Sequence, residues 1–410
     1  MADLRFVTAG ESHGPQLTGV IEGLPAGLPV SIEAINRQLA RRQRGYGRGG
    51  RMKIEKDEVE IVGGVRWGET LGGPVALVVR NRDWENWKTR MSPDPAHKGE
   101  AESVDRPRPG HADLAGVLKY AREDVRDILE RASARETTMR VAIGGLVRQM
   151  LELFGIRLVG YVVEMGAHKP QCDIGSLSFE EKAARSEASP VRCLCPEQEK
   201  DIVAEIDRIT GSDTLGGIYQ VEAHGLPIGL GSHVQWHTKL DARLAAAMLS
   251  IQAHKGVEFG LGFEAARRLG SQVHDEIIVE DGRITRASDH AGGLEGGMTN
   301  GQVLIVRAAM KPISTLARPL RSVNLKTRSE ESAAYERSDV TAVPAAAVIG
   351  ENVVAWEIAR AMVEKFGGDS LSEMRRNYDG YMAEVAKRLD LRKISRCARN
   401  DKVDGPTSQP

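Results

Sequence analysis

Short runs of apolar residues, alternating with polar ones or bounded by turn residues, recur along the chain and predict β-strands. They cover residues 17–22, 59–62, 75–79, 156–163, 218–223, 276–279 and 303–310. Between the run at 276–279 and Ile284, the pair Asp281-Gly282 predicts a two-residue hairpin turn. Asp-Gly is typical of such turns because both residues tolerate positive φ angles.

Apolar residues spaced three and four positions apart predict several helices between these strands. Ser31 is the predicted N-cap of one helix. Ser133 opens a capping-box pattern, and the long helix that follows is expected to end near Gly155. Two more helices are predicted over residues 240–252 and 343–366, and the first, rich in alanine, is expected to be buried.

The order of these elements indicates one structural unit. Strands and helices alternate irregularly, and we find no internal repeat and no low-complexity linker. We therefore predict a single domain over residues 1–399, followed by a disordered tail over residues 400–410. The polar segment 170–198 interrupts the pattern, and Cys193 and Cys195 within it are expected to be free thiols in a surface loop.

Composition narrows the class of protein. The chain has 410 residues, of which 41% are hydrophobic, so it can bury a sizeable core. Lys and Arg (56) balance Asp and Glu (57), which argues against nucleic acid as a bulk partner. Its four cysteines lack zinc-site spacing, so no metal is expected. With neither a signal peptide nor a membrane-length apolar run, we expect a cytoplasmic protein without membrane association.

Two early segments are rich in groups that move protons or bind anions. His13 lies between Ser12 and a glycine before a strand, which suits proton transfer near neutral pH, although a histidine can also simply complete such a turn. Residues 41–51 interleave arginines with glycines, which suits phosphate and carboxylate recognition. The helix dipole explains Arg41 to Arg44 but not Arg48. An RNA-binding segment is a further reading, disfavoured by the neutral net charge.

Four later segments have similar character. In residues 106–113 two prolines fix a loop that presents arginines and His111 before a predicted helix at 113–120. At residues 131–136 the N–H groups of a helix start, together with two arginines, suit phosphate. The glycine-rich stretch 290–301 leads to the polar turn 311–315, and residues 336–339 form an ion-pairing cluster. Each could equally be an ordinary turn, cap or surface salt bridge.

One glycine pattern resembles a dinucleotide-binding fingerprint. Residues 260–265 fit G-x-G-x-x-A, and Glu280 follows at about the required distance. The segment 265–269 is too short for the crossover helix that such a site needs. A dehydrogenase using this region is therefore the weaker alternative.

Taken in order, these segments resemble the chorismate synthase family over residues of about 3 to 390. The most specific are Gly-Glu-Ser-His-Gly at 10–14, Arg-Pro-Gly-His-Ala-Asp at 108–113 and Arg-Ala-Ser-Ala-Arg-Glu-Thr at 131–137. Arg-Ser-Asp at 337–339 matches a further family signature. Each motif alone is weak, but chance agreement of all of them in one order is remote.

The resemblance implies an α+β fold in which central helices are sandwiched between antiparallel β-sheets, and a homotetramer. It implies a carbon–oxygen lyase of the shikimate pathway that converts 5-enolpyruvylshikimate 3-phosphate to chorismate and phosphate by anti-1,4-elimination. Reduced FMN is the implied cofactor, although the reaction has no net redox change. No convincing NADPH motif is present, so we expect an external flavin reductase, with NADPH as the indirect reductant.

The resemblance also assigns roles to residues. His13 corresponds to the general acid for the leaving phosphate, and Ser12 lies beside it. His111 corresponds to the residue near flavin N1, and Asp339 to the carboxylate near N5. The positions that match substrate or NADP phosphate binding are Arg42 and Arg48, with Arg108 and Arg135 as further anion contacts. The matched FMN contacts are Arg131, Ala132, Ser133, Gln252, Ala253, Gly296, Lys311, Pro312, Ile313, Ser314, Thr315 and Arg337, with Gln252 standing where some relatives carry Asn.

Overall fold

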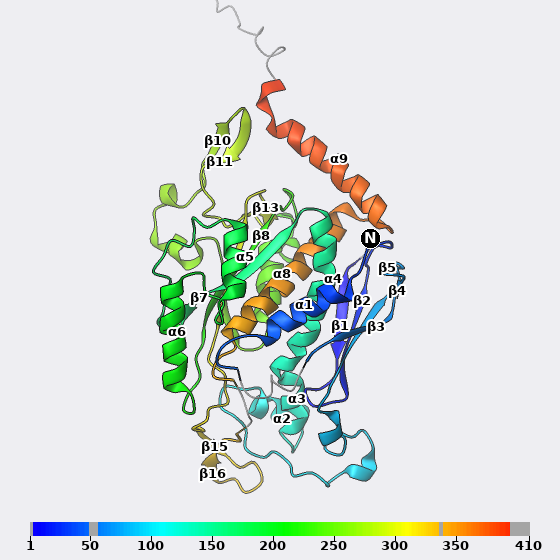
Figure 1. Ribbon diagram of the computed structural model, residues 1–410, viewed down its shortest axis with the longest axis vertical. Helices are drawn as coiled ribbons and strands as arrows, with labels where there is room; N and C mark the ends of the chain where they lie inside the picture. The colour runs from blue at the N-terminus through cyan, green and yellow to red at the C-terminus, as the bar shows by residue number, and fades with distance from the viewer. Residues whose placement is uncertain (1–2, 49–55, 336–338, 394–410) are drawn as a thin grey trace, which may run out of the picture.

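The computed structural model places two four-stranded antiparallel sheets on either side of a layer of helices (Figure 1). It describes residues 3–48, 56–335 and 339–393. The first sheet has the order β1 (Arg5–Ala9), β2 (Gln16–Glu22), β6 (Val75–Arg80) and β3 (Val59–Gly63). The second has the order β7 (Arg157–Met165), β8 (Gly217–His224), β14 (Leu304–Met310) and β9 (His254–Phe259). This confirms the predicted α+β sandwich.

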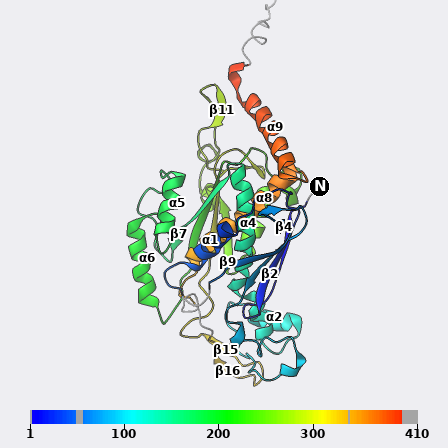
Figure 2. The same cartoon turned by 45° about the vertical axis from the view of Figure 1, so that its right-hand side comes forward.

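The helical layer consists mainly of α1 (Ile32–Gln43), α4 (Thr137–Leu153) and α8 (Val343–Phe366). Helix α4 packs against the first sheet and against α8, which in turn packs against β7 and β8 (Figure 2). Close approach between α4 and α8 depends on a glycine: a Cβ at Gly144 would lie 2.6 Å from the carbonyl oxygen of Asn352. Almost the whole of α8 is buried, as expected for a helix with apolar residues on all sides.

Smaller elements surround this sandwich. Helix α5 (Phe179–Ala188) covers β7 from outside, and α6 (Pro196–Ile209) flanks the same edge. At one end lie α2 (Asp113–Tyr120), α3 (Arg126–Ala132) and the hairpin of β15 (Arg321–Val323) and β16 (Glu330–Ser332) (Figure 1). At the other end α9 (Leu371–Leu389) projects beside the hairpin of β10 (Ile277–Glu280) and β11 (Arg283–Arg286). Short strand pairs join β4 (Val65–Arg66) to β5 (Glu69–Thr70) and β12 (Leu294–Glu295) to β13 (Met298–Thr299).

The predicted Asp281-Gly282 turn is confirmed, because it joins β10 to β11 with both residues at positive φ. Three local predictions are wrong: where the alanine-rich helix ends, how much of it is buried, and the capping box at Ser133. The alanine-rich helix α7 (Leu240–Leu249) ends early and buries only one face. Ser133 accepts a hydrogen bond from the backbone of Arg135 in a 3-10 turn, rather than forming a capping box, because Glu136 is drawn to Arg140 and Gln252 instead.

The cysteine prediction was partly wrong. Cys193 and Cys195 are free thiols, but both are buried, with 3% and 1% exposure. The chain around them folds back against the second sheet, so that Cys193 joins an apolar cluster with Val162 of β7 and Ile202 of α6. A polar stretch therefore covers an apolar strand, which its local composition did not reveal.

A fully buried carboxylate joins the layers of the sandwich. Glu351 of α8 accepts two hydrogen bonds from Arg41 of α1, at 2.6 and 2.7 Å, one from Arg148 of α4 at 2.6 Å, and one from the backbone of Gly160 in β7 at 2.6 Å. Burial alone would raise the pKa of Glu351, but the charges of Arg41 and Arg148 outweigh it and lower the pKa to about 2 from 4.5. The carboxylate therefore stays ionised and ties three helices to one strand.

We predict that Glu351→Gln lowers the free energy of unfolding by about 3–5 kcal/mol at pH 7, because it leaves buried guanidinium groups without their counter-charge. Urea unfolding followed by circular dichroism measures the change. Because the pKa of Glu351 is depressed in the fold, its contribution is present above about pH 4.5 and is lost as the pH falls toward about 2. The gap between wild type and variant should shrink over that range.

Glu180→Gln is the matched control, because Glu180 is 69% exposed and pairs with the exposed Arg157. It should change stability by less than about 1 kcal/mol. A Glu351→Gln protein as stable as this control would contradict the role given to the buried carboxylate.

Candidate active site

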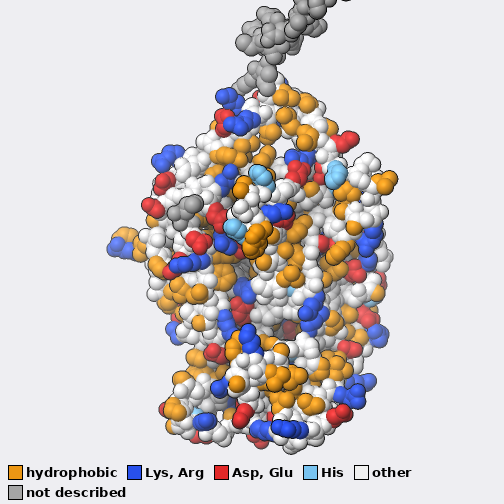
Figure 3. Space-filling view, turned by 180° about the vertical axis from the view of Figure 1, so that it is seen from behind, with side chains coloured by type: hydrophobic (Ala, Val, Ile, Leu, Met, Phe, Trp, Pro, Cys, Tyr) orange, Lys and Arg blue, Asp and Glu red, His pale blue; other side chains and the backbone are white. Residues whose placement is uncertain are grey.

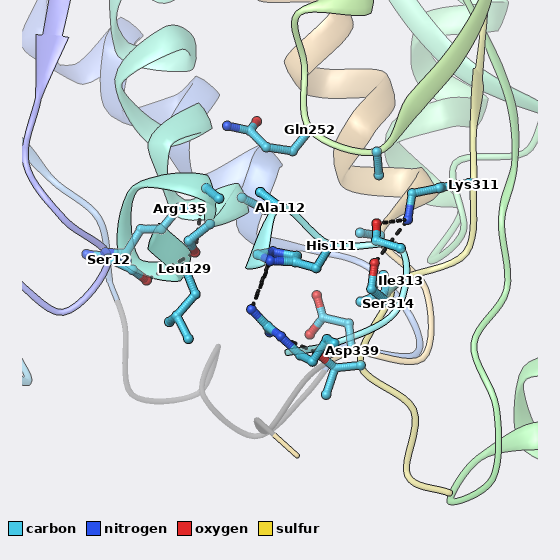
Figure 4. A pocket seen from close by; sticks show the side chains of 18 of the residues that line it. Ser12, His111, Ala112, Leu129, Arg135, Gln252, Lys311, Ile313, Ser314 and Asp339 are labelled. Carbon is cyan, nitrogen blue, oxygen red and sulfur yellow. Dashed lines mark hydrogen bonds between the residues drawn. The ribbon is translucent and has the colours of Figure 1, made fainter. Parts of the chain in front are cut away.

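Loops from distant parts of the chain converge at one end of the helical layer, around a cavity of about 500 Å³ (Figure 4). Contributions come from the β1–β2 turn, the end of α1 and the loop before α2. Others come from the α3–α4 connection, the approach to β9, the turn after β14 and the start of α8. The volume lies within the range of roughly 300–1,000 Å³ typical of small-molecule sites.

Two helices direct their N-termini at this cavity. Ala134 and Arg135, just before α4, line it, and so does Ala342, which precedes α8. A helix N-terminus carries a partial positive charge and N–H groups without partners within the helix, so it favours an anion. The same end of the layer receives the C-terminus of α1, where Arg41 and Arg42 offset the opposite dipole.

The β1–β2 turn presents His13 to the cavity. Gly10 starts this turn at φ +106°, and a Cβ there would lie 2.4 Å from the carbonyl oxygen of Gln16. The imidazole Nδ1 of His13 lies 2.9 and 3.0 Å from the two carboxylate oxygens of Glu130 in α3. The ring also stacks on Trp87, with centroids 3.7 Å apart. His13 is therefore held from the side and from its face.

A second histidine is held in a similar way. Nδ1 of His111 contacts a carboxylate oxygen of Asp113, which is fully buried at the start of α2. Arg108 donates to the same carboxylate at 2.9 Å and to Thr315 at 3.1 Å. Burial would raise the pKa of Asp113, but the hydrogen bonds from His111 and Arg108 hold it well below its usual value. The ionised carboxylate fixes both side chains at the cavity wall.

The remaining arginines are backed by carboxylates. Asp57, which is 4% exposed, lies between Arg42 at 3.4 Å and Arg135 at 3.2 Å. Arg42 also donates to the carbonyl oxygen of Ala134 at 3.1 Å. Arg48 pairs with Asp339 at 3.1 Å across the cavity edge. These contacts hold the guanidinium groups in place before any ligand arrives.

The upper side of the cavity is formed by Lys311 and Gln252 (Figure 4). Lys311 donates to the carbonyl oxygen of Gly110 at 2.9 Å and to the hydroxyl of Ser314 at 3.0 Å. Burial, followed by the charge of Lys255, lowers the pKa of Lys311. The side-chain nitrogen of Gln252 donates to Glu136 at 3.2 Å, while its Oε1 atom is buried and has no hydrogen-bond partner among the described residues.

Most of the residues predicted from the sequence meet in this cavity. The predicted residues that line it are Ser12, His13, Arg42, Arg48, Arg108, His111, Ala132, Ser133, Arg135, Gln252, Ala253, Lys311, Ile313, Ser314, Thr315 and Asp339. Pro312 lies in the same turn without lining the cavity. Arg131 points away and donates to the carbonyl oxygens of Thr8 and Gly10, both at 2.9 Å.

Two further predicted residues are not among the described residues that line the cavity. Gly296 lies in the turn between β12 and β13, at φ +59°, outside the lining. Arg337 lies outside the described residues, as does the predicted tail at 400–410.

Sequence reasoning missed the residues that support the site from behind. Glu130, Asp57 and Trp87 were assigned no function, and Asp113 was noted only as part of a motif. Glu130 could have been noticed because it directly precedes the Arg-Ala-Ser segment. Asp57 and Trp87 gave no such signal, since their partners lie far away in the sequence.

Four features would point to other protein classes: a metal site, a membrane-spanning helix, a dinucleotide-binding segment and a basic surface. Within residues 3–48, 56–335 and 339–393, no group of three or more His, Cys, Asp or Glu side chains is arranged to hold a metal ion. None of the helices described there is both long and apolar enough to span a membrane. The G-x-G-x-x-A segment forms a 3-10 helix over Gly262–Arg267 rather than a crossover helix. Figure 3 shows acidic and basic side chains intermixed on one face, not gathered into a basic surface.

Comparison with known proteins agrees with this arrangement. The family model described as chorismate synthase matches residues 4–363. A chorismate synthase of Trichlorobacter lovleyi is 59% identical over 391 residues, covering 93% of this chain and 99% of its own length. One of Brevibacillus brevis is 56% identical, covering 94% of this chain and 100% of its own length.

A solved structure is similar as well. It is titled "Crystal Structure of Chorismate Synthase" and superposes with a TM-score of 0.76 at 42% identity, covering 94% of this chain and 99% of that one. The family model, the curated relatives and the solved structure thus agree over nearly the whole chain. The chain therefore belongs to the chorismate synthase family.

Proposed function

We propose that the cavity binds 5-enolpyruvylshikimate 3-phosphate against reduced FMN and eliminates phosphate from it to give chorismate. Family membership makes the chain a carbon–oxygen lyase of the shikimate pathway, which supplies aromatic amino acids. The observation that carries the proposal is the wall of the cavity. Five cations and two imidazoles face one space: Arg42, Arg48, Arg108, Arg135, Lys311, His13 and His111.

The charge of this wall suits the substrate. The molecule carries two carboxylates and a phosphate, and guanidinium groups bind such anions in a bidentate manner. Among the described residues that line the cavity, Asp339 is the only carboxylate. Asp57 and Asp113 lie behind the cations, so they fix these groups without lining the cavity themselves. We assign Arg42, Arg48 and Arg135 to the substrate, with Arg108 as a further contact.

His13 is suited to the leaving phosphate. The phosphate ester breaks more easily when a proton reaches the departing oxygen, and a positioned imidazole can supply it. With Nδ1 held by Glu130, the proton to be transferred resides on Nε2. Ser12 lies beside His13 and shares a hydrogen bond of 3.1 Å with Ser133, which keeps a second hydroxyl near the same anion.

The residues on the other sides of the cavity fit a flavin. Within the described part of the chain the buried Oε1 of Gln252 accepts no hydrogen bond, and Lys311, Ser314 and Thr315 place donors along one wall. These residues would hold reduced FMN, which would supply electron density for a substrate whose C–H bond is not acidic. We propose that His111 holds a proton near flavin N1 and that Asp339 lies near N5.

The remaining features of the proposal come from the family. We propose a cytoplasmic homotetramer whose FMN is reduced by a separate flavin reductase at the expense of NADPH. The assignments of Arg131, Pro312, Gly296 and Arg337 to FMN stay predictions. The function is tested by mixing the protein, the substrate and dithionite-reduced FMN without oxygen. Formation of chorismate and phosphate in equal amounts is expected, and its absence would contradict the proposal.

We predict that His13→Ala lowers kcat by about 10²–10⁴-fold, the range typical of lost general acid catalysis. The KM for the substrate should change much less, because the cations remain. Chorismate absorbance in the anaerobic assay measures both constants. Circular dichroism checks that the fold is intact, and full activity in the variant would show that His13 is not the acid.

We predict that Arg48→Ala weakens substrate binding by about tenfold to a hundredfold, since a charge-assisted hydrogen bond contributes roughly 1.5–3 kcal/mol. Calorimetric titration of the substrate in the presence of oxidised FMN measures this affinity directly. Arg157→Ala, which removes an exposed cation paired with Glu180 far from the cavity, serves as the control. Equal affinity in the two variants would remove Arg48 from the site.

A further inference from the structure

We propose that Glu130 is a positioning residue that acts on His13 during the elimination. It holds a proton on Nδ1 of His13, and its negative charge balances the positive charge of the protonated ring. This inference rests on the proposed function, because it concerns how His13 delivers its proton. In that step the proton moves from Nε2 to the departing phosphate oxygen as the C–O bond breaks and its electron pair stays on oxygen. The neutral ring keeps its other proton on Nδ1, facing Glu130.

The geometry around Glu130 carries the inference. Both of its carboxylate oxygens lie within hydrogen-bond distance of His13 Nδ1, at 2.9 and 3.0 Å, and one also accepts from the backbone N–H of His13 at 2.8 Å. The backbone of Ser12 donates to the carbonyl oxygen of Glu130 at 3.0 Å. One residue thus fixes the backbone of the turn and the rotation of the ring at the same time.

Glu130 is built to remain ionised. It is 3% exposed, and Arg126, one helical turn earlier in α3, donates to it at 2.9 Å. Burial would raise the pKa of Glu130, but the hydrogen bond and charge of His13, together with the charge of Arg126, lower it. A carboxylate in this state accepts a hydrogen bond from Nδ1–H and does not itself give up a proton. It therefore acts through His13 and not on the substrate.

The other groups around His13 do not replace this charge. Trp87 stacks on the ring, and the guanidinium of Arg126 lies 5.3 Å from the centroid of the Trp87 ring. The charged and titratable groups that share the cavity with His13 are Arg42, Arg48, Arg108, Arg135, Lys311, His111 and Asp339. Most of these are cations and so do not supply a negative charge beside the ring. Glu130 is the carboxylate in direct contact with His13, so its charge is the one that the experiment has to remove.

Glu130→Gln tests this charge, because glutamine has the same shape and can still accept a hydrogen bond. We expect the basic limb of the pH profile of the single-turnover rate to move to lower pH by about one to two units, the effect typical of losing an adjacent opposite charge. Rates are measured anaerobically between pH 6 and 9 with prebound reduced FMN. A purely structural role would lower the rate equally at every pH.

Glu130→Asp is a second variant. It keeps the negative charge but shortens the side chain by one methylene, which moves the carboxylate away from His13. It should leave the basic limb in place and lower the single-turnover rate by up to about a hundredfold, because the ring loses its orientation. If Glu130→Gln does not fold, this variant decides the question. A Glu130→Asp rate equal to wild type would overturn the positioning role.

Asp127→Asn is the matched control. Asp127 lies on the same helix, is 40% exposed and pairs with Arg122 rather than with His13. Its pH profile should equal that of wild type. The inference would be overturned if the basic limb of the pH profile stayed in place in Glu130→Gln, or if it moved as far in Asp127→Asn as in Glu130→Gln.

The wild-type protein separates this inference from the proposed function. If it forms no chorismate under these conditions, the proposed function itself fails. If it forms chorismate while Glu130→Gln has an unchanged pH profile, only the positioning role of Glu130 fails.

Discussion

A buried ion-pair network around Glu351 holds the three central helices and the second sheet together. Its carboxylate binds Arg41 of α1, Arg148 of α4 and the backbone of β7, so α8 cannot slide or rotate against its neighbours. The same three helices deliver Arg42, Arg135 and the start of α8 to one cavity. Because Arg41 and Arg42 are consecutive, fixing the first toward the core sets the direction of the second toward the site.

The cavity is electrostatically organised before a ligand binds. Most of the charged side chains that face the cavity are held from behind by a carboxylate: Asp57 behind Arg42 and Arg135, Asp113 behind His111 and Glu130 behind His13. A preorganised site of this kind does not have to reorient its dipoles as charge moves to the leaving group. Two helix N-termini add fixed positive potential at the same end of the layer.

The strands, the helices and the side chains that face the cavity were easier to predict from the sequence than the carboxylates that hold those side chains in place. Strands such as β6 and the whole of α8 were predictable because apolar periodicity is a local property. The burial of Cys193 was not, because it depends on how a polar stretch folds back over β7. Asp57 was missed for a similar reason: it supports the site through Arg42 and Arg135, which folding brings to it.

A crystal structure of the complex with the enolpyruvyl substrate and oxidised FMN would test the central claim most directly. We expect both molecules in the one cavity, with the substrate phosphate within hydrogen-bond distance of His13 Nε2 and the carboxylates on the guanidinium groups of Arg48 and its neighbours. Substrate density anywhere else on the protein, or a phosphate directed away from His13, would contradict it.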